Sequence, residues 1–141
     1  MPHVSRVVQT NGTDPAANTE FSATVPAGTT WELRAVSVSL AQGATQTPLP
    51  ILIIDDGTDV IFENFGSTTV QAVNTTTRYT WAPGLTLSGQ VGATTNVHAT
   101  AALPEGLTLP SGYRVRSSTI GIGANSNYGA PSLYVVQITG T

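Results

Sequence analysis

The chain has 141 residues, a formal net charge of -3 and a sequence pI near 5.0, and 9% of its residues are charged. It contains no cysteine, which excludes disulfides, thiol nucleophiles and cysteine-based zinc or iron-sulfur sites. The acidic balance gives no basic field for nucleic-acid binding, and no apolar run reaches the roughly 18 residues of a membrane span. The length indicates one domain.

Threonine is the commonest residue, and glycine and proline are spread along the chain, as is typical of strands separated by turns. No window has the apolar spacing of an amphipathic helix. The sequence predicts an all-β, single-domain sandwich of jelly-roll type, with about eight or nine short antiparallel strands. In chain order these are expected at residues 4–9, 20–25, 31–40, 51–54, 60–65, 78–81, 97–101, 113–122 and 132–139.

The N-terminal segment, residues 1–24, is expected to supply an extended contact arm and the first strands, ahead of a sandwich formed by residues 25–141. It opens with "MPHVSRVVQT", in which one arginine lies among three valines. We expect residues 1–10 to be extended and to contact a partner or a neighbouring copy. The candidate contact residues here are His3, Val4, Arg6 and Val8.

All five basic residues of the chain are arginines. Edge strands of β-sheets are commonly protected by lysine, so a chain without lysine must protect its edges by closure, by proline or by a partner. Arg114 and Arg116, in a later strand, remain open candidates for an interface.

Two distant segments share a pattern, "VPAGTTWELRAVSVSL" and "LPSGYRVRSSTIGI", in which Pro-x-Gly precedes an aromatic residue and a strand containing arginine. Each strand changes its apolar phase partway along. In the first, Trp31 and Leu33 give way to Val36. In the second, Tyr113 and Val115 give way to Ile120 and Ile122. Such a change predicts a bulge or bend, as where a strand crosses between sheets.

The Pro-x-Gly sequence occurs once before Trp31 and twice in "LPEGLTLPSGYRVR". With proline at the second and glycine at the fourth position, each fits a type I turn, and we interpret all three as corners that start strands. These architectural residues are Pro26, Gly28, Pro104, Gly106, Pro110 and Gly112.

The stretch "ILIIDDGTDVIFENF" predicts a hairpin, because two apolar runs flank an Asp-Gly dipeptide. Its acidic loop, Asp55 to Asp59, is an alternative candidate for calcium, which prefers several carboxylate oxygens from one short loop. The spacing lacks the glutamate of an EF-hand, so the plain turn is favoured and the calcium alternative stays open.

No motif indicates an enzyme or a bound cofactor. "GIGANS", residues 121–126, resembles a dinucleotide fingerprint, but its third glycine is replaced by Ser126 and Pro131 leaves no room for a helix. His3 and His98 are the two histidines, and nothing resembles a nucleophile elbow. We therefore expect no catalytic, cofactor or metal residues.

The aromatic residues offer an alternative, a stacking platform for sugars, although most are expected to be core or corner residues. Tyr79 and Trp81 are expected to share one strand face. The set comprises Trp31, Tyr79, Trp81, Tyr113, Tyr128 and Tyr134.

The order of these features resembles the small jelly-roll virion proteins of tailed bacteriophages. The order runs from "VPAGTTWELRAVSVSL" through "LIIDDGTDVIFENF", "TTTRYTWAPGL" and "LPEGLTLPSGYRVRSSTIGI" to "YGAPSLYVVQ". These proteins decorate or cement the capsid or sit on head appendages. The resemblance covers most of the chain from Val25 onward.

The resemblance implies a non-enzymatic structural subunit, a trimer, that binds between major capsid proteins and stabilises the shell. It implies a place on the capsid surface of the virion after synthesis in the host cytoplasm, with no cofactor, nucleic acid or membrane partner. The alternative is a receptor-binding, tail-fibre or head-fibre domain that binds carbohydrate of the host surface.

Overall fold

The computed structural model describes residues 4–139, which form twelve β-strands and no helix. Within that range there is accordingly no helix of the length and apolarity that a membrane crossing needs. The strands are β1 (Val4–Asn11), β2 (Ser22–Thr24), β3 (Thr29–Gln42), β4 (Leu49–Asp55), β5 (Val60–Phe65), β6 (Thr75–Ala82), β7 (Val91–Ala93), β8 (Asn96–Ala102), β9 (Leu107–Leu109), β10 (Arg114–Ile120), β11 (Ser126–Tyr128) and β12 (Ser132–Thr139).

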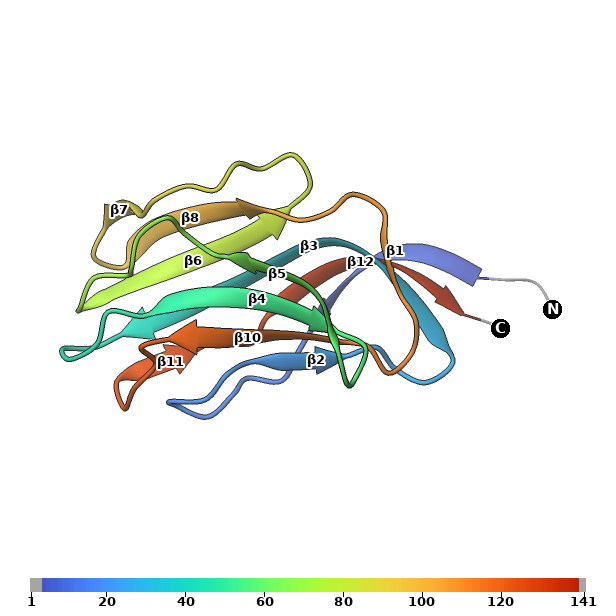
Figure 1. Ribbon diagram of the computed structural model, residues 1–141, viewed down its shortest axis with the longest axis horizontal. Helices are drawn as coiled ribbons and strands as arrows, with labels where there is room; N and C mark the ends of the chain where they lie inside the picture. The colour runs from blue at the N-terminus through green and yellow to red at the C-terminus, as the bar shows by residue number, and fades with distance from the viewer. Residues whose placement is uncertain (1–3, 140–141) are drawn as a thin grey trace.

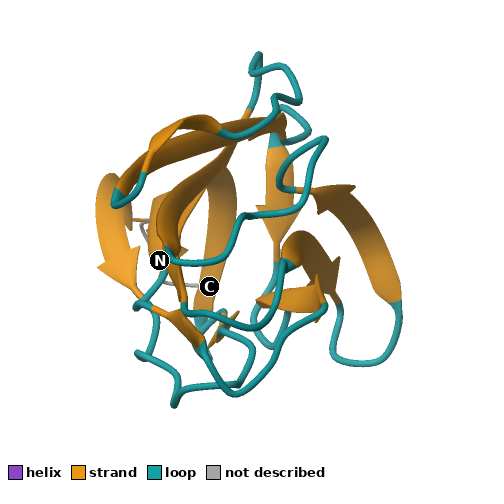
Figure 2. Ribbon diagram, turned by 90° about the vertical axis from the view of Figure 1, so that its left-hand side faces the viewer, coloured by secondary structure: helices purple, strands orange, loops and turns teal. Residues whose placement is uncertain are grey.

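The strands form two layers (Figures 1 and 2). The large sheet has the order β1-β12-β3-β6-β8-β7, and the small sheet has the order β2-β10-β4-β5. The pairing is nested in chain order: β1 pairs with β12, β2 with β10, β3 with β6 and β4 with β5. This arrangement of eight strands in two Greek keys is a jelly roll. The predicted all-β sandwich is confirmed.

All nine predicted strands are present, and β7, β9 and β11, of three residues each, are additional. Three residues are too few to show a period-2 pattern, which is why these strands were missed. The expectation of antiparallel pairing is wrong at one place, because β6 and β8 pair in parallel. After β6 the chain forms β7, which runs in the opposite direction to β6, and then turns back into β8, which pairs with β7 antiparallel. β8 therefore begins at the same end of the sheet as β6 and runs in the same direction.

β3 is the central strand of the large sheet and is paired along both edges. β12 and then β11 follow one edge, while β9 and then β6 follow the other. The predicted change of apolar phase is confirmed: Leu33 and Val36 are both fully buried, and Arg34 between them is the unpaired residue of a bulge against β12. β3 nevertheless stays in the large sheet along its whole length.

The second predicted phase change, in β10, is wrong. Val115, Ser117 and Thr119 all face the core, whereas Ile120 is 56% exposed. Polar residues can face the core here because Glu20 accepts hydrogen bonds from the Ser117 hydroxyl at 2.7 Å and the Thr119 hydroxyl at 2.6 Å. A buried polar group is tolerated when it has such a partner.

The same group of hydrogen bonds extends to Tyr128, whose hydroxyl oxygen lies 2.5 Å from the Thr119 hydroxyl oxygen. Thr119 has one hydroxyl proton, which it donates to the Glu20 carboxylate, so Tyr128 donates to Thr119. Burial raises the pKa of Tyr128, which keeps its hydroxyl proton in place for this bond. The network joins the β1–β2 connection, β10 and β11.

The three Pro-x-Gly segments are turns, as predicted, but the frame differs by one residue. Thr29 N donates to Pro26 O, and Tyr113 N donates to Pro110 O, both at 3.2 Å. Proline is therefore the first residue of each turn and glycine the third. Gly28 has φ +76° and Gly112 has φ +89°, which fits a type II turn and corrects the predicted type I. At the remaining segment, Gly106 has φ +70°.

The N-terminal segment is built into the sandwich. β1 pairs with β12 over its full length, and β2 pairs with β10. β1 and β12 run side by side to one end of the molecule, the right-hand end of Figure 1. The two ends of the described chain therefore lie together on the large sheet.

Candidate interaction surfaces

The two arginines predicted as interface residues lie together on the outer face of the small sheet, where both bind one carboxylate. Arg114 donates from Nε to Asp55 Oδ1 at 2.8 Å and from Nη2 to Oδ2 at 3.1 Å. Arg116 donates from Nε to Oδ2 at 2.6 Å. Asp55 is 1% exposed, whereas the arginine side chains are 40% and 29% exposed. The arginines thus cover an acidic residue that would otherwise face solvent.

This geometry lowers the pKa of Asp55 from 3.8 to about 2. The hydrogen bonds from Arg114 make the largest contribution, opposed by burial and assisted by Arg116 and the Gly57 N–H. Because Arg114 and Asp55 are directly opposite on β10 and β4, the ion pairs fix the register of these strands. Arg114 and Arg116 therefore have an internal structural role, whatever else they contact.

The acidic loop forms the turn of the β4–β5 hairpin, as predicted. Asp56 Oδ1 accepts hydrogen bonds from the backbone N–H of Thr58 at 2.9 Å and of Asp59 at 2.7 Å. Asp55 is held by the two arginines. Between Val4 and Thr139 no three His, Asp or Glu side chains are grouped so that they could hold a metal ion. The arrangement favours the plain turn over the calcium alternative.

Beside the ion pairs, the outer face of the small sheet carries apolar side chains. Ile51 of β4 and Phe65 of β5 are directly opposite and share this face, with Phe65 44% exposed. Leu49 and Ile120 form the adjacent pair. A shallow cleft of about 240 Å³ lies between Ile51, Phe65 and Glu63. We call this face, made of Leu49, Ile51, Phe65 and Ile120, the outer patch.

β1 is an edge strand of the large sheet, and we call its unpaired side the terminal edge. Val7 of this strand is 73% exposed on the outer face of the sheet, whereas Val8 is partly buried against the core on the other face. Of the predicted contact residues, Arg6 is exposed, and Val4 is described only by its backbone pairing with Thr139. His3 lies outside the described residues. Because side chains alternate between the two faces of a strand, Val7 lies on the face opposite to Val8 and would have been the better candidate contact residue.

The aromatic residues do not form an exposed stacking platform. Trp31, Tyr79, Trp81 and Tyr128 are at most 4% exposed, and Tyr134 is 42% exposed. Tyr79 and Trp81 share one face of β6, as predicted, with ring centres 6.1 Å apart. These buried rings contribute apolar area to the hydrophobic core and do not offer a surface on which a sugar could stack.

The remaining sequence candidates have local partners. In "GIGANS", Ser126 Oγ accepts from Gly123 N at 3.1 Å and donates to the buried Gln42, which closes the loop before β11. His98 is exposed on β8, and its Nε2 lies 3.0 Å from Asn96 Oδ1. Residues 121–126 therefore form a loop closed by its own hydrogen bonds, and His98 is a surface residue with a local partner.

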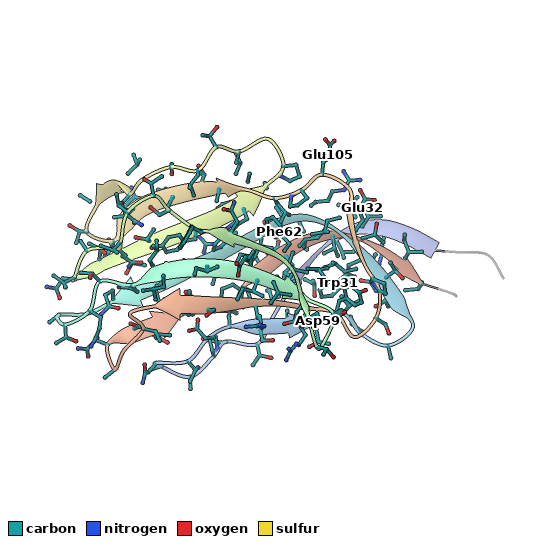
Figure 3. The ribbon with its side chains drawn as sticks, in the orientation of Figure 1. Trp31, Glu32, Asp59, Phe62 and Glu105 are labelled. Atoms are coloured by element: carbon teal, nitrogen blue, oxygen red, sulfur yellow. The ribbon has the colours of Figure 1, made fainter. Side chains whose placement is uncertain are left out.

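A cleft of about 350 Å³ lies between the free edges of the two sheets, where β1 and β2 approach each other. We call it the β1–β2 cleft. Trp31 lies on its wall, in the half of the molecule that holds the chain ends (Figure 3). Trp31 is 4% exposed, and its Nε1 has no hydrogen-bond partner within the described chain. The sequence analysis did not predict this cleft, because it depends on how the end of β1, the connection to β2 and Leu133 are brought together in the fold.

No protein-family model, curated protein or solved structure significantly matches this chain.

Proposed function

We propose that this protein is a virion structural protein of a tailed bacteriophage, which decorates and stabilises the capsid by binding between major capsid proteins. The terminal edge is the observation that carries this proposal. It provides eight residues of β-strand, one side of which pairs with no other strand between Val4 and Thr139, at the end of the molecule where both described chain ends lie.

An unpaired strand edge favours the addition of another strand, because each added residue gains main-chain hydrogen bonds. Native proteins commonly block such edges with lysine, proline or a bulge. β1 has neither lysine nor proline, and its pairing with β12 is regular over all eight residues. In the proposed complex an extended segment of the major capsid protein pairs with the terminal edge and covers Val7.

The fold and the low charge are consistent with this role. Jelly rolls recur in viral capsid and lectin domains, although a fold by itself does not specify a function. With 9% charged residues, many copies can lie close together on a shell with little repulsion. A subunit that touches several capsid proteins at once gains affinity by multivalency and needs no deep pocket.

We further propose that the protein assembles as a trimer, as in the virion proteins that the sequence resembles. Light scattering on the purified chain measures the mass. A mass of three chains supports this part of the proposal, and a monomer or dimer contradicts it without affecting the capsid role.

Co-sedimentation tests the capsid role. The purified protein is mixed with shells assembled from the major capsid protein encoded in the same genome, and the shells are pelleted. Saturable co-pelleting, together with increased resistance of the shells to heat, supports decoration. The absence of the protein from the pellet contradicts it.

A second candidate function, binding of host-surface carbohydrate by a receptor-binding or fibre domain, is favoured by one observation, the β1–β2 cleft, whose lining residues are uncharged and include several hydroxyl side chains. A glycan array on the isolated protein distinguishes the two functions, because capsid decoration requires no response to glycans.

A further inference from the structure

The main-chain groups along β1 point alternately toward β12 and toward the open side of the sheet. Gly12 N donates to Pro131 O at 2.9 Å, one position beyond the last paired residues of the two strands. In an antiparallel pair, successive residues direct their main-chain groups to opposite sides. Counting back from Gly12, Val7 and Gln9 therefore direct their N–H and C=O groups to the open side. These residues offer main-chain hydrogen bonds to an added strand.

Among the strands that end the two sheets within the described chain, β1 is the one best suited to pairing with another chain. β2 and β7 have three residues each. β5 contains a bulge against β4, and its Asn64 side chain donates to Ala102 O of β8 at 3.0 Å. Short, bulged or covered strands resist the addition of another strand, whereas β1 is eight residues long and regular.

On the outer face of the sheet, β1 and β12 present apolar side chains beside the terminal edge. Val7 is directly opposite Val136, and residues that are directly opposite share a face. The next pair on this face is Gln9 and Tyr134. Val7 is 73% exposed, Tyr134 is 42% exposed and Val136 is half-buried. A residue of an added strand opposite Val7 therefore gains most contact if its side chain is apolar.

On the other face of β1, Arg6 is a cation that forms no ion pair with any residue of the described chain. Its side chain is exposed, and the ion pairs within the range 4–139 all involve other arginines. Its neighbour across the ladder is the neutral Gln137. Opposite charges that face each other across two strands stabilise the pairing. An added strand is therefore favoured if it carries a carboxylate opposite Arg6.

A second copy of the chain does not supply that carboxylate from its own terminal edge. β1 has the sequence "VSRVVQTN", which contains neither aspartate nor glutamate. Two copies paired through their β1 strands would leave Arg6 of each copy without an acidic partner on the facing strand. The charge of the terminal edge therefore favours a different chain as the partner.

We propose that the terminal edge selects an extended segment of its partner that carries an acidic residue opposite Arg6 and an apolar residue opposite Val7. The inference rests on the proposed attachment of a capsid segment at this edge, and it specifies the chemistry of that segment. Antiparallel addition lets one residue exchange both main-chain hydrogen bonds with Val7. Val8 packs against the core, so an apolar residue fits opposite it as well. In the antiparallel direction the segment reads apolar-apolar-acidic.

The test uses the intact protein labelled with ¹⁵N and capped peptides of the same length as β1, eight residues. The acidic peptide is threonine throughout, except for two central valines followed by one glutamate, which are placed opposite Val8, Val7 and Arg6. The basic peptide has lysine in place of the glutamate. The exchanged peptide has the glutamate and the second valine in the reverse order. Binding is followed by the backbone N–H signals of Val7 and Gln9.

We expect the acidic peptide to bind at least about fivefold more tightly than the basic or the exchanged peptide. In Arg6→Glu the preference should reverse in favour of the basic peptide, because the charge opposite the variable residue is then negative. The matched control is Arg78→Glu, which makes the same change of charge at an exposed arginine of β6 and should keep the wild-type preference. Both arginines are exposed, so both variants are expected to fold.

Three results overturn the inference. They are equal binding of the acidic and basic peptides to wild type, an unchanged preference in Arg6→Glu, and no shift at Val7 and Gln9 with any peptide.

Co-sedimentation with shells separates this inference from the capsid role. If the acidic peptide is preferred but the protein does not pellet with shells, the capsid role fails and the inference stands. If wild type and Arg6→Glu pellet equally, the inference fails and the capsid role stands.

Discussion

Arg116 Nε lies 2.6 Å from Asp55 Oδ2, although the two residues are 61 positions apart in the chain. Arg114 binds the same carboxylate through two nitrogens. Two residues that the sequence presents as possible partner contacts are thus tied to the acidic hairpin of their own chain. The cluster explains how Asp55 can be 1% exposed and still ionised.

Asp55→Asn removes the negative charge while keeping the shape of the side chain. We expect the free energy of unfolding at pH 7 to fall by about 2 kcal/mol, less than for a fully buried pair because the arginines reach solvent. Urea denaturation followed by tryptophan fluorescence measures it. Asp59→Asn, in the same turn, is the control and should change stability by less than about 0.5 kcal/mol.

The same ion pairs make stability depend on pH. The pKa of Asp55 is about 2 in the folded protein, against 3.8 as its ordinary value. The folded state therefore binds this proton less readily, and the stabilisation is present above pH 3.8 and lost as the pH falls toward 2. The stability difference between wild type and Asp55→Asn should be constant from pH 7 to about 5 and shrink below about 4. A difference that stays constant down to pH 2.5 contradicts the assignment.

Thr119→Val tests the hydrogen-bond network around Glu20. The change leaves the buried Tyr128 hydroxyl without an acceptor and removes a donor from Glu20, so we expect a loss of about 2 to 3 kcal/mol. Tyr128→Phe removes its own polar group and should cost about 1 kcal/mol. Thermal unfolding of both variants and of the double variant measures the coupling.

In the double variant, Tyr128→Phe should cost nothing further or restore some stability, because no unpartnered hydroxyl remains. Purely additive losses would show that the Tyr128 and Thr119 hydroxyls are not coupled.

Gly112→Ala tests the corrected frame of the turn before β10. An added Cβ would meet nothing within 4 Å, so the only cost comes from φ +89°. We expect a loss of about 1 to 2 kcal/mol, and a smaller loss for Gly112→Asn, because asparagine tolerates positive φ better. Differential scanning calorimetry measures both variants.

The matched control for that turn is Gly129→Ala. Gly129 has no positive φ, and the nearest atom to an added Cβ is Ser39 O at 4.0 Å. Its replacement should be neutral or stabilise slightly. Equal losses at Gly112 and Gly129 would exclude a special backbone conformation at Gly112.

The sequence predicts much of this fold because the signals are local. Leu33 and Val36 are three residues apart, an odd spacing that would put them on opposite faces of a regular strand, so the presence of both in the apolar pattern predicts the bulge that Arg34 forms. The dipeptide Asp56-Gly57 predicts the β4–β5 hairpin. In each case neighbouring residues carry the information.

The candidate surfaces were harder to predict from the sequence, because they depend on contacts between residues that are distant in the chain. No pattern around Ser117 or Thr119 shows that Glu20 supplies their partner across the sheet. Similarly, Arg114 and Asp55 are ordinary surface residue types until β10 and β4 pair. The turn frame was missed because Pro-x-Gly fits both type I and type II, and the hydrogen bond to proline O decides between them.

The capsid role is tested most directly at Val7. Deleting residues 1–10 would remove most of β1 from the large sheet, so a point variant is more informative. Val7→Lys places a charge on the terminal edge at a residue 73% exposed. Val91→Lys is the matched control, on β7 at the opposite edge of the same sheet and 64% exposed. Both variants should fold with wild-type stability within about 0.5 kcal/mol.

The measurement is the occupancy of capsid shells in co-sedimentation, for wild type and the two variants at the same concentration. We predict that Val7→Lys weakens shell binding at least about tenfold, whereas Val91→Lys binds like wild type. Equal binding of all three proteins, or an equal loss in both variants, would contradict attachment through the terminal edge.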